Sequence, residues 1–156
     1  LTGEKYLDYY EFNHGLKSCI LRLGNVYGPR QDPLGEAGVI AIFLDRIKNN
    51  KKPIIFGDGK QTRDYVHTGD VVKACLSGMK KEGTYNIGTG SETSVNQLVD
   101  ILSKVIGYNV EAIHGEARKG EVKRIFLGIK KAREELGWKP KITIEEGIMN
   151  LWRATS

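Results

Sequence analysis

The sequence predicts an α/β fold, because short apolar runs typical of strands alternate with segments of helical periodicity along all 156 residues. Two capping boxes, at residues 94–97 and 143–146, place a hydroxyl before a Gln or Glu and predict helix starts. No internal repeat is visible, and no stretch rich in proline and serine divides the chain. We therefore expect residues 1–156 to form a single domain or a part of one.

The first expected element is a helix over residues 1–11, with apolar and charged side chains on different faces. The Asn-His-Gly sequence at residues 13–15 stops it. A mostly apolar run over residues 18–23 then predicts a buried strand. Residues 24–38 are rich in Gly, Pro and Asp and predict a long loop, and loops of this length in compact domains tend to carry function.

The remaining elements follow from helical spacing, capping residues and helix breakers. Ser94 and Gln97 cap a helix that begins at the next residue, whereas Gly137 stops a shorter helix and Pro140 lies just beyond it. The capping box at Thr143 opens the last helix. The expected helices cover residues 39–49, 68 or 70 to 79, 95–106, 130–136 and 144–152, and the expected strands cover residues 53–56, 85–87 and 110–113.

The composition is that of a soluble globular protein, with 40% hydrophobic and 28% charged residues. The formal net charge of +5 suits an anionic small ligand. The densest basic group, Lys48 with Lys51 and Lys52, is typical of a solvated helix end, and no zinc-finger, RNP or basic-zipper pattern accompanies it. We therefore expect no nucleic acid partner, and a non-catalytic basic module that binds RNA is the alternative from another class.

Neither the cysteines nor the histidines have the spacing of metal ligands. Cys19 and Cys75 both lie in apolar periodic segments, so we expect two buried free thiols. His14, His67 and His114 are isolated from one another, so we expect no metal. No apolar stretch approaches the length of a membrane span and no signal peptide opens the chain, which predicts no membrane partner and a cytoplasmic location.

Arg63 is the strongest candidate for a ligand contact. It follows the glycine turn of residues 56–60 on a short extended segment and precedes a polar helix start. Its planar guanidinium is suited to phosphate. A structural role is the alternative, because Asp64, Asp70 and Glu121 could each form an ion pair with it.

Residues 88–93 carry a weak dinucleotide fingerprint. The segment follows an expected strand, precedes a helix, and has Glu111 roughly twenty residues further on. Thr93 stands where a third glycine would allow close helix packing, so a strand-to-helix turn that ends in the Ser94 cap is the favoured interpretation. Residues 118–121 form a second cationic turn, which is either a ligand contact or a solvated loop.

Seven motifs occur in order and span essentially the whole chain: residues 25–31, 35–40, 56–59, 62–67, 85–88, 118–121 and 136–140. Together they resemble the carboxy-terminal half of the UDP-glucose 4-epimerase-like extended short-chain dehydrogenase/reductases. The resemblance implies the last strand of a Rossmann sheet and a small mixed α/β substrate domain, with the cofactor half of the Rossmann fold missing. Residues 1–23 would end the Rossmann part, and residues 24–156 would mainly bind substrate.

The resemblance also implies a UDP-sugar site in which each matching residue has a role. Arg63 and Arg118 would clamp the diphosphate, which Asn25 would also contact. Phe56 would lie near the uracil, and Glu121 would accept hydrogen bonds from the ribose hydroxyls. Two guanidinium groups suit two phosphates, and a carboxylate suits a diol.

The other implied contacts come from apolar side chains and from the backbone. Tyr65 and Val95 would line the nucleotide pocket, whereas Gly38 and Val39 would approach the base through backbone groups. NAD is the implied cofactor of the full-length enzyme. The residues that match positions near its nicotinamide are Leu23 and Val26.

Two parts of the family pattern, the Gly-x-x-Gly-x-x-Gly cofactor loop and the catalytic Tyr-x-x-x-Lys pair, are absent from these residues. The pair would end immediately before Leu1, and since a natural product begins with Met, we expect this chain to be a piece of something longer. Tyr6, Tyr9 and Tyr10 lack a Lys four positions later, so no catalytic residue is expected and the chain alone should be inactive. Gly128 stands where relatives carry an aspartate that caps the next helix.

The resemblance therefore implies an NAD-dependent UDP-glucose 4-epimerase of the UDP-glucose/UDP-galactose type, which is a homodimer at full length. A nucleotide-sugar 4,6-dehydratase or decarboxylase of the same family is the alternative, because the acids that separate these reactions would lie upstream. Residues 35–39 favour the epimerase. The identity of the sugar stays open at this point, as does the oligomeric state of this piece.

Overall fold

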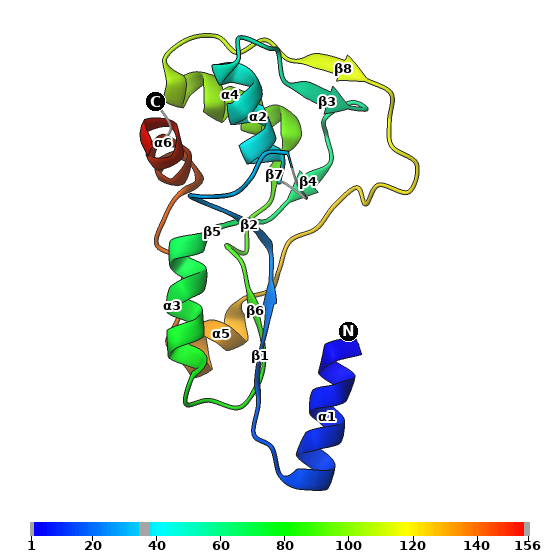
Figure 1. Cartoon of the computed structure of the whole chain (residues 1–156), viewed down its shortest axis with the longest axis vertical. Coiled ribbons are helices and arrows are strands. Elements are labelled where there is room, and N and C mark those ends of the chain that lie inside the picture. The colour runs from blue at the N-terminus through cyan, green and yellow to red at the C-terminus, as the bar shows by residue number, and fades with distance from the viewer. Residues whose placement is uncertain (1, 35–37, 155–156) are drawn as a thin grey trace.

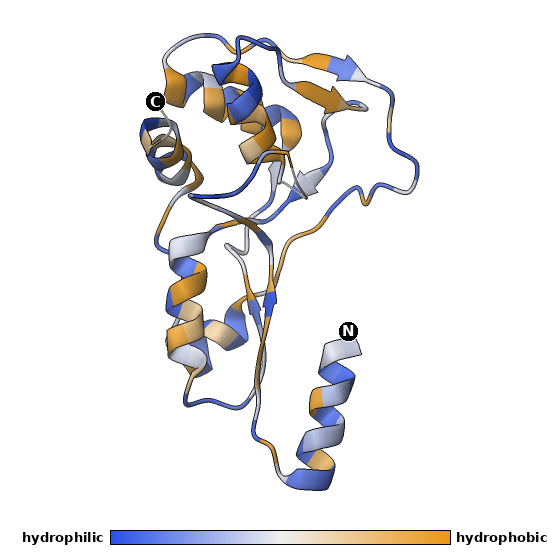
Figure 2. Cartoon of the chain, in the orientation of Figure 1, coloured by the Kyte–Doolittle hydropathy of each residue, from blue (hydrophilic) through white to orange (hydrophobic). Residues whose placement is uncertain are grey.

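The structure, a computed structural model, describes residues 2–34 and 38–154. The chain is elongated, with two packed units joined by short strands and a first helix that lies beside the lower unit (Figure 1). That helix, α1 (Thr2–His14), contributes no buried residue and is largely hydrophilic (Figure 2). Within the described residues, no helix has both the length and the apolar character needed to cross a bilayer.

The first packed unit, the β1–β6 unit, is a pair of parallel strands covered by two helices. The register pairs Cys19 with Gly83 and Leu23 with Ile87. Both helices present a fully buried alanine to the sheet, Ala74 and Ala132, and small side chains let a helix approach closely. Its elements are β1 (Cys19–Leu23), α3 (Thr68–Gly78), β6 (Gly83–Ile87) and α5 (Lys130–Leu136).

The second packed unit, the helical unit, holds three helices and one parallel strand pair around the larger core. Its helix α4 begins at a complete capping box, in which Ser94 Oγ accepts from Gln97 N–H and the Gln97 side chain accepts from Ser94 N–H. Phe43, Leu98 and Ile148 meet in its core. Its elements are α2 (Val39–Lys48), β3 (Ile54–Phe56), α4 (Val95–Ile106), β8 (Ile113–Gly115) and α6 (Ile144–Ala154).

Two further strand pairs connect the units: β2 (Asn25–Tyr27) runs parallel to β5 (Tyr65–His67), and β4 (Thr62–Arg63) runs antiparallel to β7 (Thr93–Ser94). The chain changes partner at Gly24, whose N–H donates to the Ile87 carbonyl at 2.8 Å. A Cβ at Gly24 would lie only 2.8 Å from the Asp64 carbonyl oxygen, so the close crossing requires glycine.

Several predicted elements are confirmed. The helices over residues 95–106 and 130–136 have the predicted bounds, and Gly137 ends the shorter one in the left-handed region at φ 63°. The predicted capping box at Thr143 is also present, because Thr143 Oγ1 accepts from Glu146 N–H and the Glu146 carboxylate accepts from Thr143 N–H. The helix that it opens continues to Ala154.

Two predictions about the first half of the chain were wrong, and a third needs a change of bounds. The strand predicted over residues 18–23 forms but is not buried, since Leu23 is 46% exposed and β6 is the one partner of β1 among the described residues. The loop predicted over residues 24–38 contains strand β2, which pairs with a segment forty residues away. The first helix is confirmed, with its predicted stop at residues 13–15, but it continues to His14 rather than ending near residue 11, and Gly15 follows at φ 65°.

Two further predictions also need correction. The strand predicted over residues 110–113 begins only at Ile113, because Val110 N–H donates to the Ser103 hydroxyl rather than to a strand. Cys75 is exposed and Cys19 half-buried, so the two thiols are free as predicted but not buried. Cys75 lies on the outer face of α3, next to the buried Ala74.

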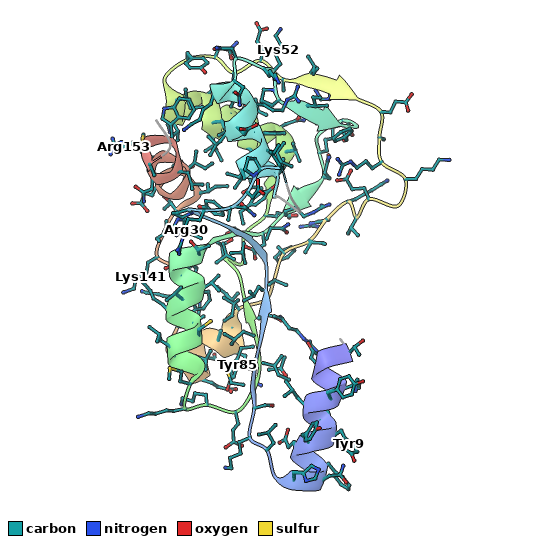
Figure 3. All side chains as sticks on the ribbon, viewed as in Figure 1. Tyr9, Arg30, Lys52, Tyr85, Lys141 and Arg153 are labelled. Carbon is teal, nitrogen blue, oxygen red and sulfur yellow. The ribbon has the colours of Figure 1, made fainter. Side chains whose placement is uncertain are left out.

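The exposure of tyrosine side chains differs between α1 and the packed units. Tyr9 projects from α1 and is 57% exposed, whereas Tyr85 is buried between β6 and α5 (Figure 3). The Tyr85 hydroxyl donates to the Glu82 carbonyl at 2.7 Å and lies 3.1 Å from a Glu135 carboxylate oxygen. The packed part of the structure thus lies in the two units, and the candidate site is found where the connecting strands meet the helical unit.

Candidate functional site

All nine residues predicted to contact substrate line one cavity of about 230 Å³. The cavity lies where the connecting strands meet the helical unit, against α2, β3 and the start of α4. Five other residues also line it and were not predicted: Ile42, Phe43, Ile54, Ile55 and Gln61. The nine predicted residues are Asn25, Gly38, Val39, Phe56, Arg63, Tyr65, Val95, Arg118 and Glu121.

The connecting strands bring the polar members of this set together. Strands β2 and β5 pair in a register that sets Asn25 directly beside Tyr65. Because side chains alternate along an extended chain, Arg63 and Tyr65 both face the cavity while Asp64 between them points to the opposite side. Strand β2 and the extended residues 62–67, which contain β4 and β5, thus place three of the predicted contacts on one wall.

Arg63 is held by the chain segment that forms the opposite wall. Its guanidinium donates to the carbonyls of Thr62 and Val122 at 2.8 and 2.7 Å, and to the Glu121 carboxylate at 3.4 Å. The ion pair is largely shielded, with side-chain exposures of 18% for Arg63 and 27% for Glu121. Glu121 is therefore the partner among the three acids considered from the sequence. Because Arg118 adds a second positive charge, the cavity keeps a net charge that favours an anion.

Arg118 and Phe56 form the end of the cavity that is nearest to the glycine turn. The guanidinium of Arg118 lies over the Phe56 ring. Gln61 lies beside them and donates from its side-chain amide to the Phe56 carbonyl at 2.9 Å. The only signal for Gln61 in the sequence was its place between the glycine turn and Arg63.

Tyr65 offers a neutral hydrogen-bond donor rather than a base. Its hydroxyl is buried and has no hydrogen-bond partner among the described residues. Burial raises the pKa of Tyr65 to about 12, an effect that the nearby Arg63 charge partly opposes. The hydroxyl therefore stays protonated at neutral pH and can donate to a ligand atom.

An adjoining cavity of about 500 Å³ holds the two residues predicted to lie near the nicotinamide, Leu23 and Val26. It shares four residues with the first cavity: Asn25, Gly38, Val39 and Tyr65. The Gln31 side-chain oxygen, on the wall of this second cavity, is buried and has no partner among the described residues. Residues 35–37, part of the motif that favours the epimerase, lie outside the described residues.

The turn at residues 88–90 does not offer an anion site, because the chain fills it with its own carboxylate. Asp64 accepts from the backbone N–H groups of Thr89 and Gly90 at 2.7 and 3.1 Å. A Cβ at Gly88 would collide with the same carboxylate. The turn thus acts as the strand-to-helix connection favoured from the sequence, and not as a phosphate loop.

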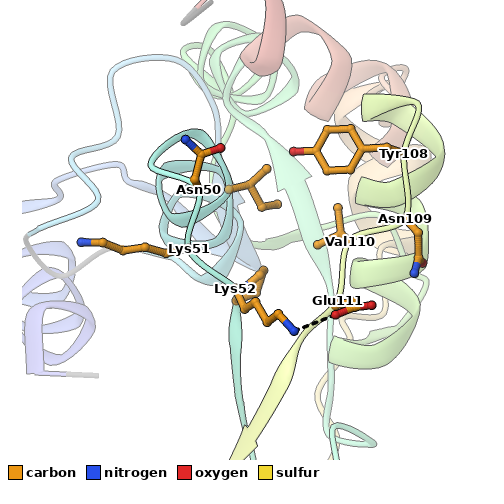
Figure 4. Close-up of a pocket in the computed structure, with 9 residues that line it drawn as sticks. Asn50, Lys51, Lys52, Tyr108, Asn109, Val110 and Glu111 are labelled. Atoms are coloured by element: carbon orange, nitrogen blue, oxygen red, sulfur yellow. Dashed lines mark hydrogen bonds and ion pairs between the residues drawn. The ribbon is translucent and has the colours of Figure 1, made fainter.

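Other parts of the described chain show weaker evidence of a ligand site. No group of three or more His, Cys, Asp or Glu side chains within the described residues is placed to hold a metal ion. A separate cavity of about 250 Å³ lies at the end of α2, where Lys52 and Glu111 form an ion pair of 2.6 Å across its rim (Figure 4). None of the predicted site residues lines that cavity.

The chain matches the GDP-mannose 4,6 dehydratase family over residues 1–151. It is 57% identical, over 148 residues, to a putative UDP-glucose 4-epimerase of Methanocaldococcus jannaschii, and the match covers 94% of this chain and 48% of the relative. The chain therefore spans about half the length of this curated relative. A UDP-glucuronic acid decarboxylase of Arabidopsis thaliana is also among the relatives.

Solved structures give the same result. The structure is similar to that of UDP-glucose 4-epimerase with UDP-glucose from Thermotoga maritima, with a TM-score of 0.93 and 47% identity over 99% of this chain and 52% of that one. It is also similar to the UDP-glucose 4-epimerase complex with NAD from Thermus thermophilus, with a TM-score of 0.86 and 36% identity over 98% of this chain and 52% of that one.

Proposed function

The chain belongs to the extended short-chain dehydrogenase/reductase family of nucleotide-sugar enzymes, and we propose that it forms the UDP-sugar-binding part of an NAD-dependent UDP-glucose 4-epimerase. One observation carries the proposal: Arg63 and Arg118, far apart in sequence, line the same cavity together with Phe56 and Glu121. The two guanidinium groups suit the two phosphates of a diphosphate, the Phe56 ring offers an apolar plane for a base, and the Glu121 carboxylate can accept hydrogen bonds from a ribose.

In the proposed complex the two guanidinium groups hold the diphosphate, and Asn25 contacts it from β2. Glu121 accepts hydrogen bonds from the ribose hydroxyls, and Phe56 lies beside the uracil. The backbone at residues 38–39 approaches the base, while Tyr65 and Val95 close the pocket. These contacts would hold the sugar at the adjoining cavity lined by Leu23 and Val26. The contribution of this chain would then be to position the sugar for the reaction.

NAD, when bound, would take a hydride from the C4 position of the sugar and return it to the opposite face of the ketosugar. Leu23 and Val26 fit the apolar side of a nicotinamide, because both line the cavity adjoining the substrate site. The turn at residues 88–90 does not offer a site for the pyrophosphate of the cofactor, since Asp64 fills it. We therefore propose that residues 1–23 end the Rossmann part and that residues 24–156 mainly bind substrate.

Two finer statements extend the proposal. We expect the full-length enzyme to form a homodimer through α1, because Tyr6, Tyr9 and Tyr10 are exposed on a helix that buries none of its residues. We also expect a reducing, cytoplasmic location, which suits the free thiols of Cys19 and Cys75.

Calorimetric titration of the chain with UDP-glucose, at several salt concentrations, tests the proposal. We expect saturable binding that UDP competes for, and no conversion to UDP-galactose when NAD is added. A random oligonucleotide is the comparison: binding that falls steeply with salt and ignores UDP would instead support a nucleic-acid module. Measurable turnover by the chain alone would contradict the assignment of catalysis to residues outside it.

A second titration separates the epimerase from the decarboxylase. An epimerase binds both C4 epimers, so UDP-glucose and UDP-galactose should have affinities within about tenfold of each other. A strong preference for UDP-glucuronate over both would favour the decarboxylase alternative. The decarboxylase among the relatives is the specific observation behind this alternative.

A further inference from the structure

We propose that Asp64, which contacts neither cavity, is a positioning residue that fixes the two walls of the substrate site relative to each other. The proposal rests on the proposed function, because the walls matter for binding only if Arg63, Arg118 and Glu121 hold one ligand. Asp64 is fully buried, with 0% of its surface exposed, and lies in the chain between two residues of the site wall.

The Asp64 carboxylate collects four hydrogen bonds from two distant segments. One oxygen accepts from Thr89 N–H at 2.7 Å and from the Thr89 hydroxyl at 2.6 Å. The other accepts from Gly90 N–H at 3.1 Å and from Leu127 N–H at 3.2 Å. A buried carboxylate requires such donors, because burial without them removes the hydration of its charge and puts nothing in its place.

The contact to Leu127 matters most for the site. Residues 122–127 run beside residues 62–64: Lys123 accepts from Thr62 N–H at 2.9 Å, and Ile125 N–H donates to the Thr62 carbonyl at 3.3 Å. The Asp64–Leu127 hydrogen bond ends this series. The same segment begins directly after Glu121, so its attachment to residues 62–64 sets where Glu121 and Arg118 stand relative to Arg63.

The backbone of Asp64 fixes the other wall. Its carbonyl accepts from Asn25 N–H at 2.7 Å, at the start of β2. One residue thus binds β2 through its main chain, and the turn at residues 88–90 and the segment at residues 122–127 through its side chain. A change at Asp64 should therefore move ligand contacts that Asp64 does not touch.

Asp64→Asn tests the proposal with little change in volume. Whichever way the amide is turned, its NH₂ group faces at least one backbone N–H that now lacks an acceptor. We expect a loss of UDP-glucose affinity of about tenfold or more, and faster amide hydrogen exchange over residues 118–127 without ligand. The matched control is Asp100→Asn, which removes a carboxylate from the exposed face of α4 and should change neither quantity.

A double-mutant cycle separates positioning from a general loss of stability. If Asp64 acts by placing Arg118, most of the affinity loss of Asp64→Asn should disappear in an Arg118→Ala background. Strictly additive losses, or exchange that rises equally in α4 and in residues 118–127, would overturn the proposal. If the wild-type chain fails to bind UDP-glucose, the proposed function falls, but the exchange measurement still decides whether Asp64 orders this segment.

Thr89→Val keeps the proposal testable if Asp64→Asn does not fold. It removes one of the four hydrogen bonds and retains the carboxylate. We expect a loss of affinity of about twofold to fivefold, with faster exchange confined to residues 88–91 and 118–127, because Ser91 N–H also donates to the Thr89 hydroxyl. Unchanged affinity together with unchanged exchange would contradict the proposed role.

Discussion

The guanidinium of Arg118 lies 4.0 Å from the centroid of the Phe56 ring. A planar cation at this distance is attracted to the negative face of an aromatic ring, and the attraction grows where water is excluded. The stack joins a group proposed for the diphosphate to a group proposed for the base. A nucleotide would therefore meet both groups at one end of the cavity.

This stack predicts different effects for its two members. Phe56→Ala removes the apolar surface beside the base, so it should weaken uridine and UDP-glucose alike, by about fivefold to tenfold. Arg118→Ala removes a phosphate contact, so it should weaken UDP-glucose by about tenfold or more and uridine much less. Titrations of both variants with both ligands check this. Equal losses for uridine in the two variants would contradict the division of roles.

Arg63→Ala should lower the affinity for UDP-glucose by about tenfold to a hundredfold, because a charge-assisted contact contributes about 1.5–3 kcal/mol. The fold should be retained, since the strands around Arg63 are paired through their backbones. Calorimetry gives the affinity and circular dichroism the fold. Arg133→Ala removes an exposed guanidinium from α5 and serves as the control. Unchanged binding by Arg63→Ala would exclude it from the clamp.

The parts of the fold that could be predicted from the sequence are those determined by neighbouring residues. The capping box of Ser94 and Gln97 closes within four residues, and Gly137 ends α5 by its own conformation. Strand β2 could not be predicted in this way, because three residues have no readable period and their partner is β5. Val110 was misjudged for the same reason, since a serine hydroxyl in α4 holds its N–H.

The same distinction, between residues identified by local sequence and residues placed by tertiary contacts, applies to the candidate site. Motif similarity selected residues that the fold brings onto one cavity, although they come from segments up to about a hundred residues apart. The motifs did not identify Gln61, because its place on the cavity wall depends on the tertiary structure, in which its side-chain amide donates to the Phe56 carbonyl. The sequence indicated Asp64 only as an ion-pair partner of Arg63, because the hydrogen-bond donors that its carboxylate accepts from, at Thr89 and Leu127, are distant in sequence.

Ser94→Ala should lower the free energy of unfolding by about 1 kcal/mol, because it leaves the N–H of Gln97 without its cap. Urea unfolding followed by circular dichroism measures this change. Ser91→Ala, at an exposed position outside α4, is the control and should change stability by less than about 0.5 kcal/mol. Equal stabilities of the two variants would show that the cap does not contribute.

Gly147→Ala and Gly3→Ala should have opposite effects, although both place alanine in a helix. A Cβ at Gly147 would collide with the Tyr27 hydroxyl, whereas a Cβ at Gly3 would have no described atom within 4 Å apart from its chain neighbours and its own helix backbone. We expect Gly147→Ala to destabilise by about 1–3 kcal/mol through overpacking. Gly3→Ala should stabilise by up to about 1 kcal/mol through helix propensity. Thermal unfolding of both variants provides the comparison, and a stabilising Gly147→Ala would contradict the packing of α6 on β2.

The capping role of His67 leads to a prediction of how the stability of the fold depends on pH. It caps α3 by accepting Gly69 N–H on Nδ1 at 3.0 Å, which requires an unprotonated nitrogen. Burial lowers the pKa of His67 below its ordinary value of 6.5; the Asp70 carboxylate opposes this shift and Lys73 adds to it. The unfolded chain therefore binds more protons just below pH 6.5 than the folded one does. Stability from His67 should be complete above that pH and be lost as the pH falls through this window.

Urea unfolding at about pH 7.5 and about pH 5.5 measures this loss. Asp70 titrates separately: burial would raise its pKa, but hydrogen bonds from Ile142 and Lys141 and the Lys73 ammonium lower it below 3.8. His67→Asn keeps a good capping acceptor that does not titrate, so it should reduce the difference in stability between the two pH values. His14→Asn, on the exposed α1, should leave that difference unchanged, and an unchanged difference in His67→Asn would exclude the cap as its source.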